Sequence, residues 1–84
     1  MKTVARPAGA MIIVFSKSSP TGNFYCRFDN AVAVPSGDIT DGSAGEVNPT
    51  MRSLVGATTI NLVSDATMNV TLAFFTTPRV SSIG

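Results

Sequence analysis

The sequence contains no histidine, no tryptophan and a single cysteine, Cys26, among its 84 residues. Histidine is the commonest general base in enzymes and, together with cysteine, the usual ligand of structural zinc. A single cysteine cannot form an internal disulfide. These absences lead us to expect a protein that is not an enzyme, that binds no cofactor and that has no zinc site or disulfide to stabilise it.

Charged residues are scarce as well. Asp, Glu, Lys and Arg make up 13% of the chain, against about 25% in an average soluble domain, and the formal net charge is +1. The polar residues are mostly small and uncharged, and such groups are buried at an interface at lower cost than charges. A chain of this length has a thin core, and small domains without disulfides or metals are often stabilised by oligomerisation. We therefore expect a protein that associates with itself or with other chains.

Long apolar runs are absent too. The longest candidate, residues 8–15, spans eight residues, whereas a membrane-spanning helix needs about 20. Lys2 and Arg6 precede this run as in a secretory signal, but Pro7 interrupts the approach to the run and no clear cleavage site follows. We interpret the run as a core strand, and we expect neither a signal peptide nor a membrane partner.

The most regular pattern lies in residues 57–76, where two alternating runs flank Ser64 and Asp65. Because successive side chains of a strand point to opposite faces, a period of two indicates strands. The apolar face of the two runs is formed by Ile60, Leu62, Met68, Val70, Leu72 and Phe74. We predict a β-hairpin with one apolar face and one neutral face of small residues.

Other segments add shorter strands. Residues 11–15 form a continuous apolar run that fits a strand buried on both sides, and residues 23–28 alternate, with Cys26 among the apolar positions as a core thiol. Residues 31–34 fit a short strand that Pro35 ends. After Asn48, a possible helix N-cap, residues 51–55 fit a short helix and a strand equally well.

Together these segments predict an all-β fold, a small single-domain β-barrel or sandwich of four to six strands. The β domain would cover residues 11–76, with an irregular N-terminal arm at residues 1–10 and an irregular C-terminal arm at residues 77–84. Residues 35–48 form a connection that is long for a compact domain, as binding loops and disordered loops are.

Two alternative functions start from residues in these segments. Asp38, Asp41 and Glu46 place oxygen ligands along a glycine-rich loop, as a hard cation requires, although the loop does not fit the EF-hand pattern. Residues 23–28 set aromatic side chains beside Arg27, as in barrels that bind single-stranded nucleic acid. The nucleic-acid interpretation is the stronger of the two alternatives, but the basic residues are spread along the chain and the net charge is small, so it is weaker than a structural role.

The features together favour a structural role. We interpret the chain as an accessory subunit of a protein shell, of the cement, decoration or minor capsid type found in bacteriophage virions. It would be made in the host cytoplasm, would form a homo-oligomer and would bind a larger shell protein through β-rich contacts and its terminal arms. A solvent-facing strand usually carries charge, so the neutral face of residues 57–76 is a candidate contact surface. The predicted partner contacts are Lys2, Arg6, Thr59, Asn61, Asn69, Thr71, Phe75 and Arg79.

Overall fold

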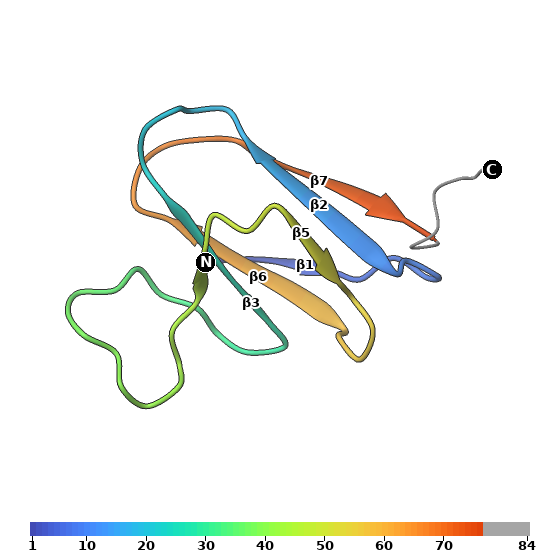
Figure 1. Cartoon of the computed structure of the whole chain (residues 1–84), viewed down its shortest axis with the longest axis horizontal. Coiled ribbons are helices and arrows are strands. Elements are labelled where there is room, and N and C mark those ends of the chain that lie inside the picture. The colour runs from blue at the N-terminus through green and yellow to red at the C-terminus, as the bar shows by residue number, and fades with distance from the viewer. Residues whose placement is uncertain (77–84) are drawn as a thin grey trace.

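The computed structural model describes residues 1–76, which contain seven β-strands and no helix (Figure 1). The strands are β1 (Lys2–Ala5), β2 (Ile12–Lys17), β3 (Phe24–Phe28), β4 (Glu46–Val47), β5 (Met51–Ser53), β6 (Thr59–Ser64) and β7 (Val70–Phe75). The predicted all-β class is confirmed. The strand count exceeds the predicted four to six because β1 and β4 are short strands that the sequence pattern did not indicate.

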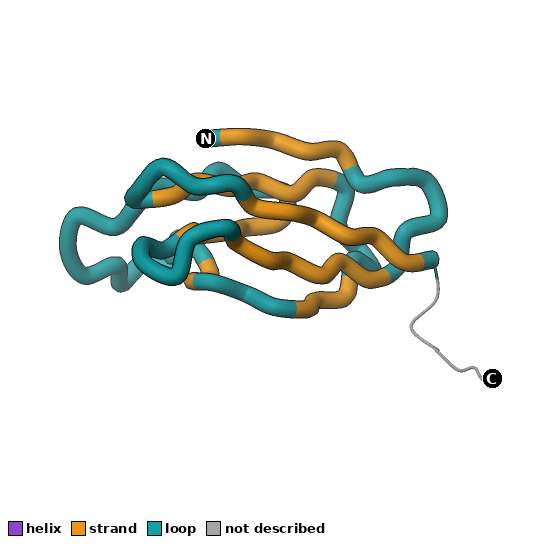
Figure 2. The backbone as a smooth tube through the Cα atoms, turned by 90° about the horizontal axis from the view of Figure 1, so that it is seen from above, coloured by secondary structure: helices purple, strands orange, loops and turns teal. Residues whose placement is uncertain are grey.

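The strands form two antiparallel sheets that pack as an open sandwich (Figure 2). Sheet A has the order β1-β6-β3-β4, and sheet B has the order β5-β2-β7. Only the connection from β3 to β4 stays within one sheet. At each of the remaining connections the chain crosses from one sheet to the other. The fold is thus a sandwich and not a closed barrel.

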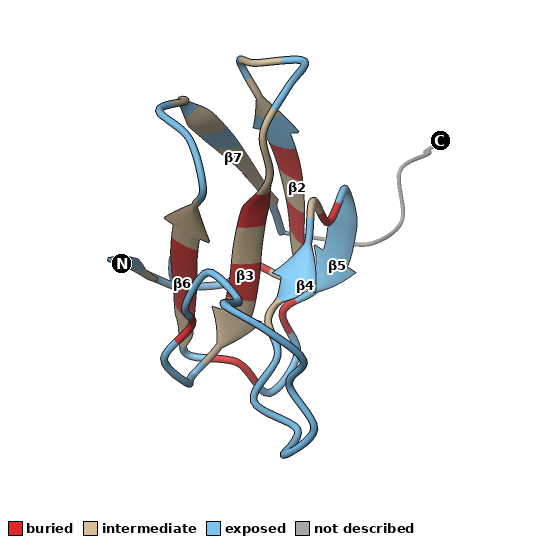
Figure 3. Ribbon diagram, turned by 90° about the vertical axis from the view of Figure 1, so that its left-hand side faces the viewer, coloured by how far each residue is buried: buried red, intermediate tan, exposed pale blue. Residues whose placement is uncertain are grey.

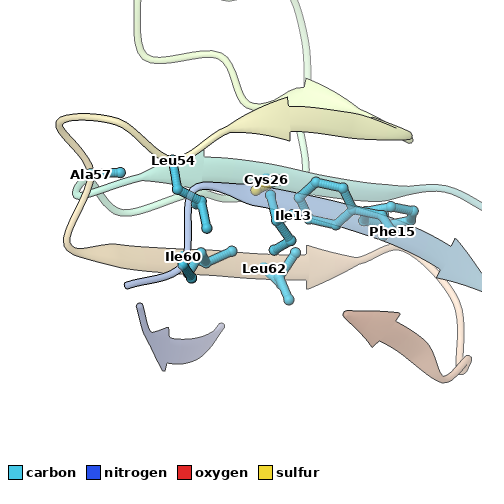
Figure 4. Close-up of a cluster of buried hydrophobic side chains, with 9 residues drawn as sticks. Ile13, Phe15, Cys26, Leu54, Ala57, Ile60 and Leu62 are labelled. Atoms are coloured by element: carbon cyan, nitrogen blue, oxygen red, sulfur yellow. The ribbon is translucent and has the colours of Figure 1, made fainter. Parts of the chain in front are cut away.

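The core lies between the sheets and is built from alternate residues of the central strands (Figure 4). Ile13 of β2 and Ile60 of β6 are fully buried, and Cys26 of β3 lies in the same cluster. Leu54, from the connection between β5 and β6, packs in the same cluster and is also fully buried. In β3, β6 and β7 the inward positions are those that the period of two assigned to the apolar faces.

The predicted hairpin is wrong, although its apolar face is right. β6 pairs with β1 and β3 in sheet A, whereas β7 pairs with β2 in sheet B. The segment between them is tied to other strands: Asn23 N–H donates to Asp65 Oδ1 (2.7 Å), and Asn69 N–H donates to Ser18 Oγ (2.9 Å). These bonds lead the chain across the roughly 10 Å between the layers, so residues 57–76 form an arch and not a two-stranded ladder.

The predicted N-terminal arm also needs correction. Lys2–Ala5 is an edge strand, paired with β6 from Lys2 opposite Leu62 to Ala5 opposite Thr59. Arg6 follows it and donates from Nε to Ala10 O (2.7 Å) and from Nη1 to Ala57 O (3.0 Å). Residues 1–10 are therefore held by the sandwich. The predicted C-terminal arm, residues 77–84, lies outside the described residues.

The middle of the chain differs from the prediction in two places. Residues 31–34 form no strand. The ambiguous segment after Asn48 contains the strand β5, and Asn48 caps no helix: its backbone has a φ of 47°, and its side-chain Oδ1 accepts the N–H of Phe24 (3.0 Å). Asparagine tolerates this left-handed conformation, so Asn48 turns the chain from sheet A to sheet B.

Candidate assembly surface

The outer face of sheet A is covered in part by its own chain, around Asn61. Asn61 of β6 is only 5% exposed: its Nδ2 donates to Asn30 O (2.6 Å), and its Oδ1 accepts the hydroxyl of Thr3 (2.8 Å). Val32, two residues beyond Asn30, is also buried. The segment that leaves β3 thus lies over this face and holds the side chain of Asn61. The hydrogen-bonding groups of Asn61 are used within the chain, which argues against the partner contact predicted for this residue.

The aromatic and basic stretch of β3 is divided between the two faces of sheet A. Phe24 points into the core and is 2% exposed, and Phe28 packs against the same core. Arg27, on the outer face, donates from Nη1 to Ala31 O (3.0 Å). Two of the three aromatic rings that could stack on bases are therefore used in packing, which gives the nucleic-acid interpretation no support.

The outer face of sheet B differs from that of sheet A because no other segment of residues 1–76 forms a third layer over it (Figure 3). Its residues follow from the register, since cross-strand partners share a face and Ile13 and Phe15 point inward. We call it the sheet B face, and it consists of Ile12, Val14, Ser16, Met51, Ser53, Thr71, Ala73 and Phe75. None of these residues carries a charge. Met51 is 58% exposed and Phe75 is 48% exposed, so the face presents apolar surface to solvent.

The structure separates the predicted contact residues. Thr71 and Phe75 lie on the sheet B face, whereas Thr59 and Asn61 lie on the opposite face of the sandwich. Asn69 is exposed just before β7. Three others are accounted for elsewhere. Lys2 is at the edge of sheet A, Arg6 is hydrogen-bonded within the chain, and Arg79 lies outside the described residues.

Sequence reasoning missed Ile12, Val14 and Met51 on the sheet B face. The first two belong to the run that was interpreted as buried on both sides, yet both are partly exposed. Met51 comes beside Val14 only through the pairing of β5 with β2. The serine at position 16, which continues the exposed face of β2, was the available signal that this strand has one outward side.

The two flanks of the sandwich are also unlike each other. At one flank, Glu46 of β4 and Arg52 of β5 form an ion pair between the sheets, with Arg52 Nε 2.8 Å from Glu46 Oε1. The hydrogen bond to Glu46 and the negative charge of Glu46 raise the pKa of Arg52. At the other flank, between β1 and β7, a pocket of about 300 Å³ is lined by residues that include Lys2, Met68 and Val70. The flank between β4 and β5 is thus bridged by an ion pair, whereas the flank between β1 and β7 is open.

Two of the three acidic side chains predicted as cation ligands, Asp41 and Glu46, are engaged within the chain. Asp41 Oδ1 accepts the hydroxyl (2.6 Å) and the N–H (3.0 Å) of Ser43, which lowers the pKa of Asp41. Glu46 is paired with Arg52. Residues 1–76 contain no group of three or more His, Cys, Asp or Glu side chains placed to hold a metal ion. Nor do they contain a helix long and apolar enough to cross a membrane.

Thr59 is fixed by a turn at the end of β3. Asp29 has a φ of 65°, and its Oδ1 accepts the hydroxyl (2.6 Å) and N–H (2.8 Å) of Thr58 and the N–H of Thr59 (2.9 Å). These bonds lower the pKa of Asp29 from 3.8 to about 2. A lowered pKa means that the stabilisation is present above pH 3.8 and is lost as the pH falls toward 2. The turn thus serves the fold of sheet A.

Cys26 is a core thiol, as the sequence indicated. Its side chain is 5% exposed, and burial, followed by the charge of Glu46, raises its pKa from 9.0 to about 11. Since the thiolate is the reactive form, this environment makes the thiol inert at neutral pH.

The raised pKa of Cys26 predicts an alkaline loss of stability. The thiol stays protonated in the folded chain while it ionises in the unfolded chain, so the stabilisation is complete below pH 9 and is lost as the pH rises toward 11. Between pH 8 and pH 10 the wild type should lose up to about 1 kcal/mol more than the Cys26→Ala variant. Urea unfolding of both proteins at both pH values measures the difference. Equal losses would show that the thiol is not desolvated.

Comparisons of the chain with protein-family models, with curated proteins and with solved structures found no match to any of the three.

Proposed function

We propose that this protein is a structural assembly subunit, an accessory component of a virion or a similar protein shell, that attaches to a larger shell protein through the sheet B face. The observation that carries the proposal is the absence of charge from this three-stranded face, together with the exposure of Met51 and Phe75 on it. Outer faces of sheets and strand edges are usually kept apart from other chains by charged side chains.

The energetics of burial support attachment through this side. The central part of the face is apolar, with Val14 between Met51 and Ala73, so covering it removes no charge from water. Hydroxyl groups of Ser16, Ser53 and Thr71 surround this centre and can form hydrogen bonds at a rim. The centre of the opposite face, around Asn61, already packs against the chain's own loop. The sheet B face is thus the side that gains most from a partner.

The proposal changes where the contacts lie. Residues 2–5 are paired in β1 and are not a free arm, so the main contact moves from the N-terminal arm to the sheet B face. Antiparallel two-sheet folds occur in viral capsid proteins and in many unrelated proteins. The architecture is therefore compatible with a shell subunit by analogy only, and the surface is what supports the function.

The test compares two lysine substitutions at apolar positions of similar exposure, 58% for Met51 and 51% for Val47. Met51→Lys lies on the sheet B face, and Val47→Lys, the matched control, lies on the neighbouring edge strand but faces outward from sheet A. Tagged wild type and variants are expressed in the protein's source, and particles are separated on a density gradient and identified by electron microscopy. We expect wild type and Val47→Lys in the particle fraction, and at least about tenfold less of Met51→Lys, because its ammonium group would be desolvated at the contact.

Two results would overturn the proposal. Wild-type protein that stays at the top of the gradient, separate from any particle, would exclude a shell subunit. Particles that retain both lysine variants equally would show that attachment does not use the sheet B face.

A further inference from the structure

β7 is an edge strand whose outward backbone groups have no partner strand among residues 1–76. Ser18 N–H donates to Asn69 O (2.9 Å), and bonded and non-bonded pairs alternate along an antiparallel ladder. The register then directs the backbone groups of Thr71, Ala73 and Phe75 toward β2. The backbone N–H and C=O groups of the alternate residues, Val70, Leu72 and Phe74, point away from β2, to the side of β7 that has no partner strand among residues 1–76.

This edge is longer than the other three and is the one without charge. β4 has two residues and includes Glu46, β5 has three and includes Arg52, and β1 has four and includes Lys2. β7 has six residues, VTLAFF, and none is charged or a proline. Natural edge strands are usually protected from pairing by shortness, charge, proline or a bulge. β7 lacks the first three protections along its whole length.

The inner side of β7 is also incompletely covered. Val70, Leu72 and Phe74 point toward the core and pack against it, yet all three remain partly exposed. The pocket of about 300 Å³ between β1 and β7 lies beside Val70 and Met68. A strand added at this edge would place side chains over this flank, so the backbone and the side chains of β7 are left open on the same side.

A second copy of β7 fits this edge in one favoured register. We propose that two copies of the chain pair β7 with β7 in antiparallel orientation about a twofold axis, with Leu72 opposite Leu72 of the second copy. Val70 then lies opposite Phe74 of the second copy, and Phe74 opposite Val70. All three outward residues become hydrogen-bonded pairs, and sheet B continues across both copies.

Neighbouring registers satisfy fewer groups. A shift of the axis to Thr71 or to Ala73 leaves one of the three outward residues without a partner inside the strand. In the proposed register, the phenyl ring of Phe74 of the second copy lies beside Val70, at the pocket on the open flank. The dimer also joins the two sheet B faces into one uncharged surface. The inference thus deepens the proposed assembly function by naming a second copy as the partner at this edge.

Disulfide crosslinking of single cysteines placed along β7 identifies the register between the two copies directly. In a Cys26→Ala background, Leu72→Cys, Thr71→Cys and Ala73→Cys are each treated with the thiol oxidant diamide and separated on a non-reducing gel. Hydrogen-bonded antiparallel partners have Cα atoms about 5.5 Å apart, within the range of a disulfide, whereas the diagonal from Thr71 to its own copy is about 7–8 Å. We expect a dimer from Leu72→Cys alone, and a mixed dimer when Thr71→Cys and Ala73→Cys are combined.

Amide hydrogen exchange of the unsubstituted protein keeps the test independent of the variants. The amides of Val70, Leu72 and Phe74 should exchange at least about tenfold more slowly at high than at low protein concentration. The outward amides of Thr3 and Ala5 on β1 serve as the control and should not change. Concentration-independent exchange at all these amides, or crosslinking of Thr71→Cys or Ala73→Cys with itself as efficient as that of Leu72→Cys, would overturn the pairing.

The β7 pairing and the shell attachment are tested by separate measurements, so either proposal can be rejected without the other. Crosslinking and exchange are measured on the isolated protein, whereas the effect of Met51→Lys is measured on particles. A register-specific crosslink without particle binding upholds the dimer and rejects the shell role. Particle binding without the crosslink rejects the dimer and leaves the shell role in place.

Discussion

Replacing Ile13 by alanine is expected to destabilise the fold by about 2–5 kcal/mol, one of the two largest effects that the structure predicts for a single substitution. Ile13 is fully buried in β2, the central strand of sheet B, and lies opposite Arg52 on one side and Phe74 on the other. A chain of 84 residues has a total stability of roughly 4–13 kcal/mol. The cavity would therefore remove a large part of the margin that keeps the protein folded.

The neighbouring Ile12 is the matched control for Ile13. It is the same residue type in the same strand, but it lies on the sheet B face and is partly exposed. Ile12→Ala should cost less than about 1 kcal/mol in the isolated chain, and Ile13→Val about 0.5–1.5 kcal/mol. Urea unfolding of the three variants measures the order. Equal costs at positions 12 and 13 would mean that both sides of β2 are buried, as the apolar run alone had indicated.

The sequence pattern was sufficient to assign faces but not partners. The period of two placed Ile60 and Leu62 inward in β6, and Leu72 and Phe74 inward in β7. It contains no information on which strands pair, because a strand shows the same alternation in a hairpin and in an arch. The arch between β6 and β7 depends on bonds of Asp65 and Asn69 to residues more than 40 positions away. Such contacts could not be inferred from local spacing.

β1 shows the same limit at the N-terminus. Its four residues have no alternation to detect, and three of them are exposed. They become a strand because β6 offers a free edge, and Thr3 adds a hydrogen bond to Asn61, 58 positions away. The candidate surface was predicted in part for a related reason. Thr71 and Phe75 were found from the neutral side of β7, whereas Met51 joins them only through sheet pairing.

Asn61→Asp is the second substitution expected to have a large effect, and we expect a loss of about 2–4 kcal/mol at pH 7. The new carboxylate would be buried in sheet A, and one of its oxygens would face the carbonyl oxygen of Asn30, which now accepts a hydrogen bond from Asn61 Nδ2 (2.6 Å). Thr3 could still donate to the other oxygen. The repulsion and the desolvation both disfavour the charged form.

The loss caused by Asn61→Asp should therefore depend on pH. The folded protein would raise the pKa of the new carboxyl group above its unfolded value, so the variant should regain stability as the pH falls from 7 to 4, where the protonated group can donate to Asn30 O. Urea unfolding of variant and wild type at both pH values gives the difference. Asn69→Asp, at an exposed asparagine, is the control and should change stability by less than about 0.5 kcal/mol.

The result for Asn61 also decides which side of the sandwich is available to other chains. A large, pH-dependent loss means that the loop after β3 packs on sheet A in solution, so that the sheet B face is the side left for partners. A loss no larger than that of Asn69→Asp would mean that the loop does not hold Asn61, and the outer face of sheet A would then be open as well. In that case Asn61 would regain the contact role that its place on the neutral side of β6 first indicated. The sheet B face would then no longer be distinguished from the outer face of sheet A by being the uncovered one.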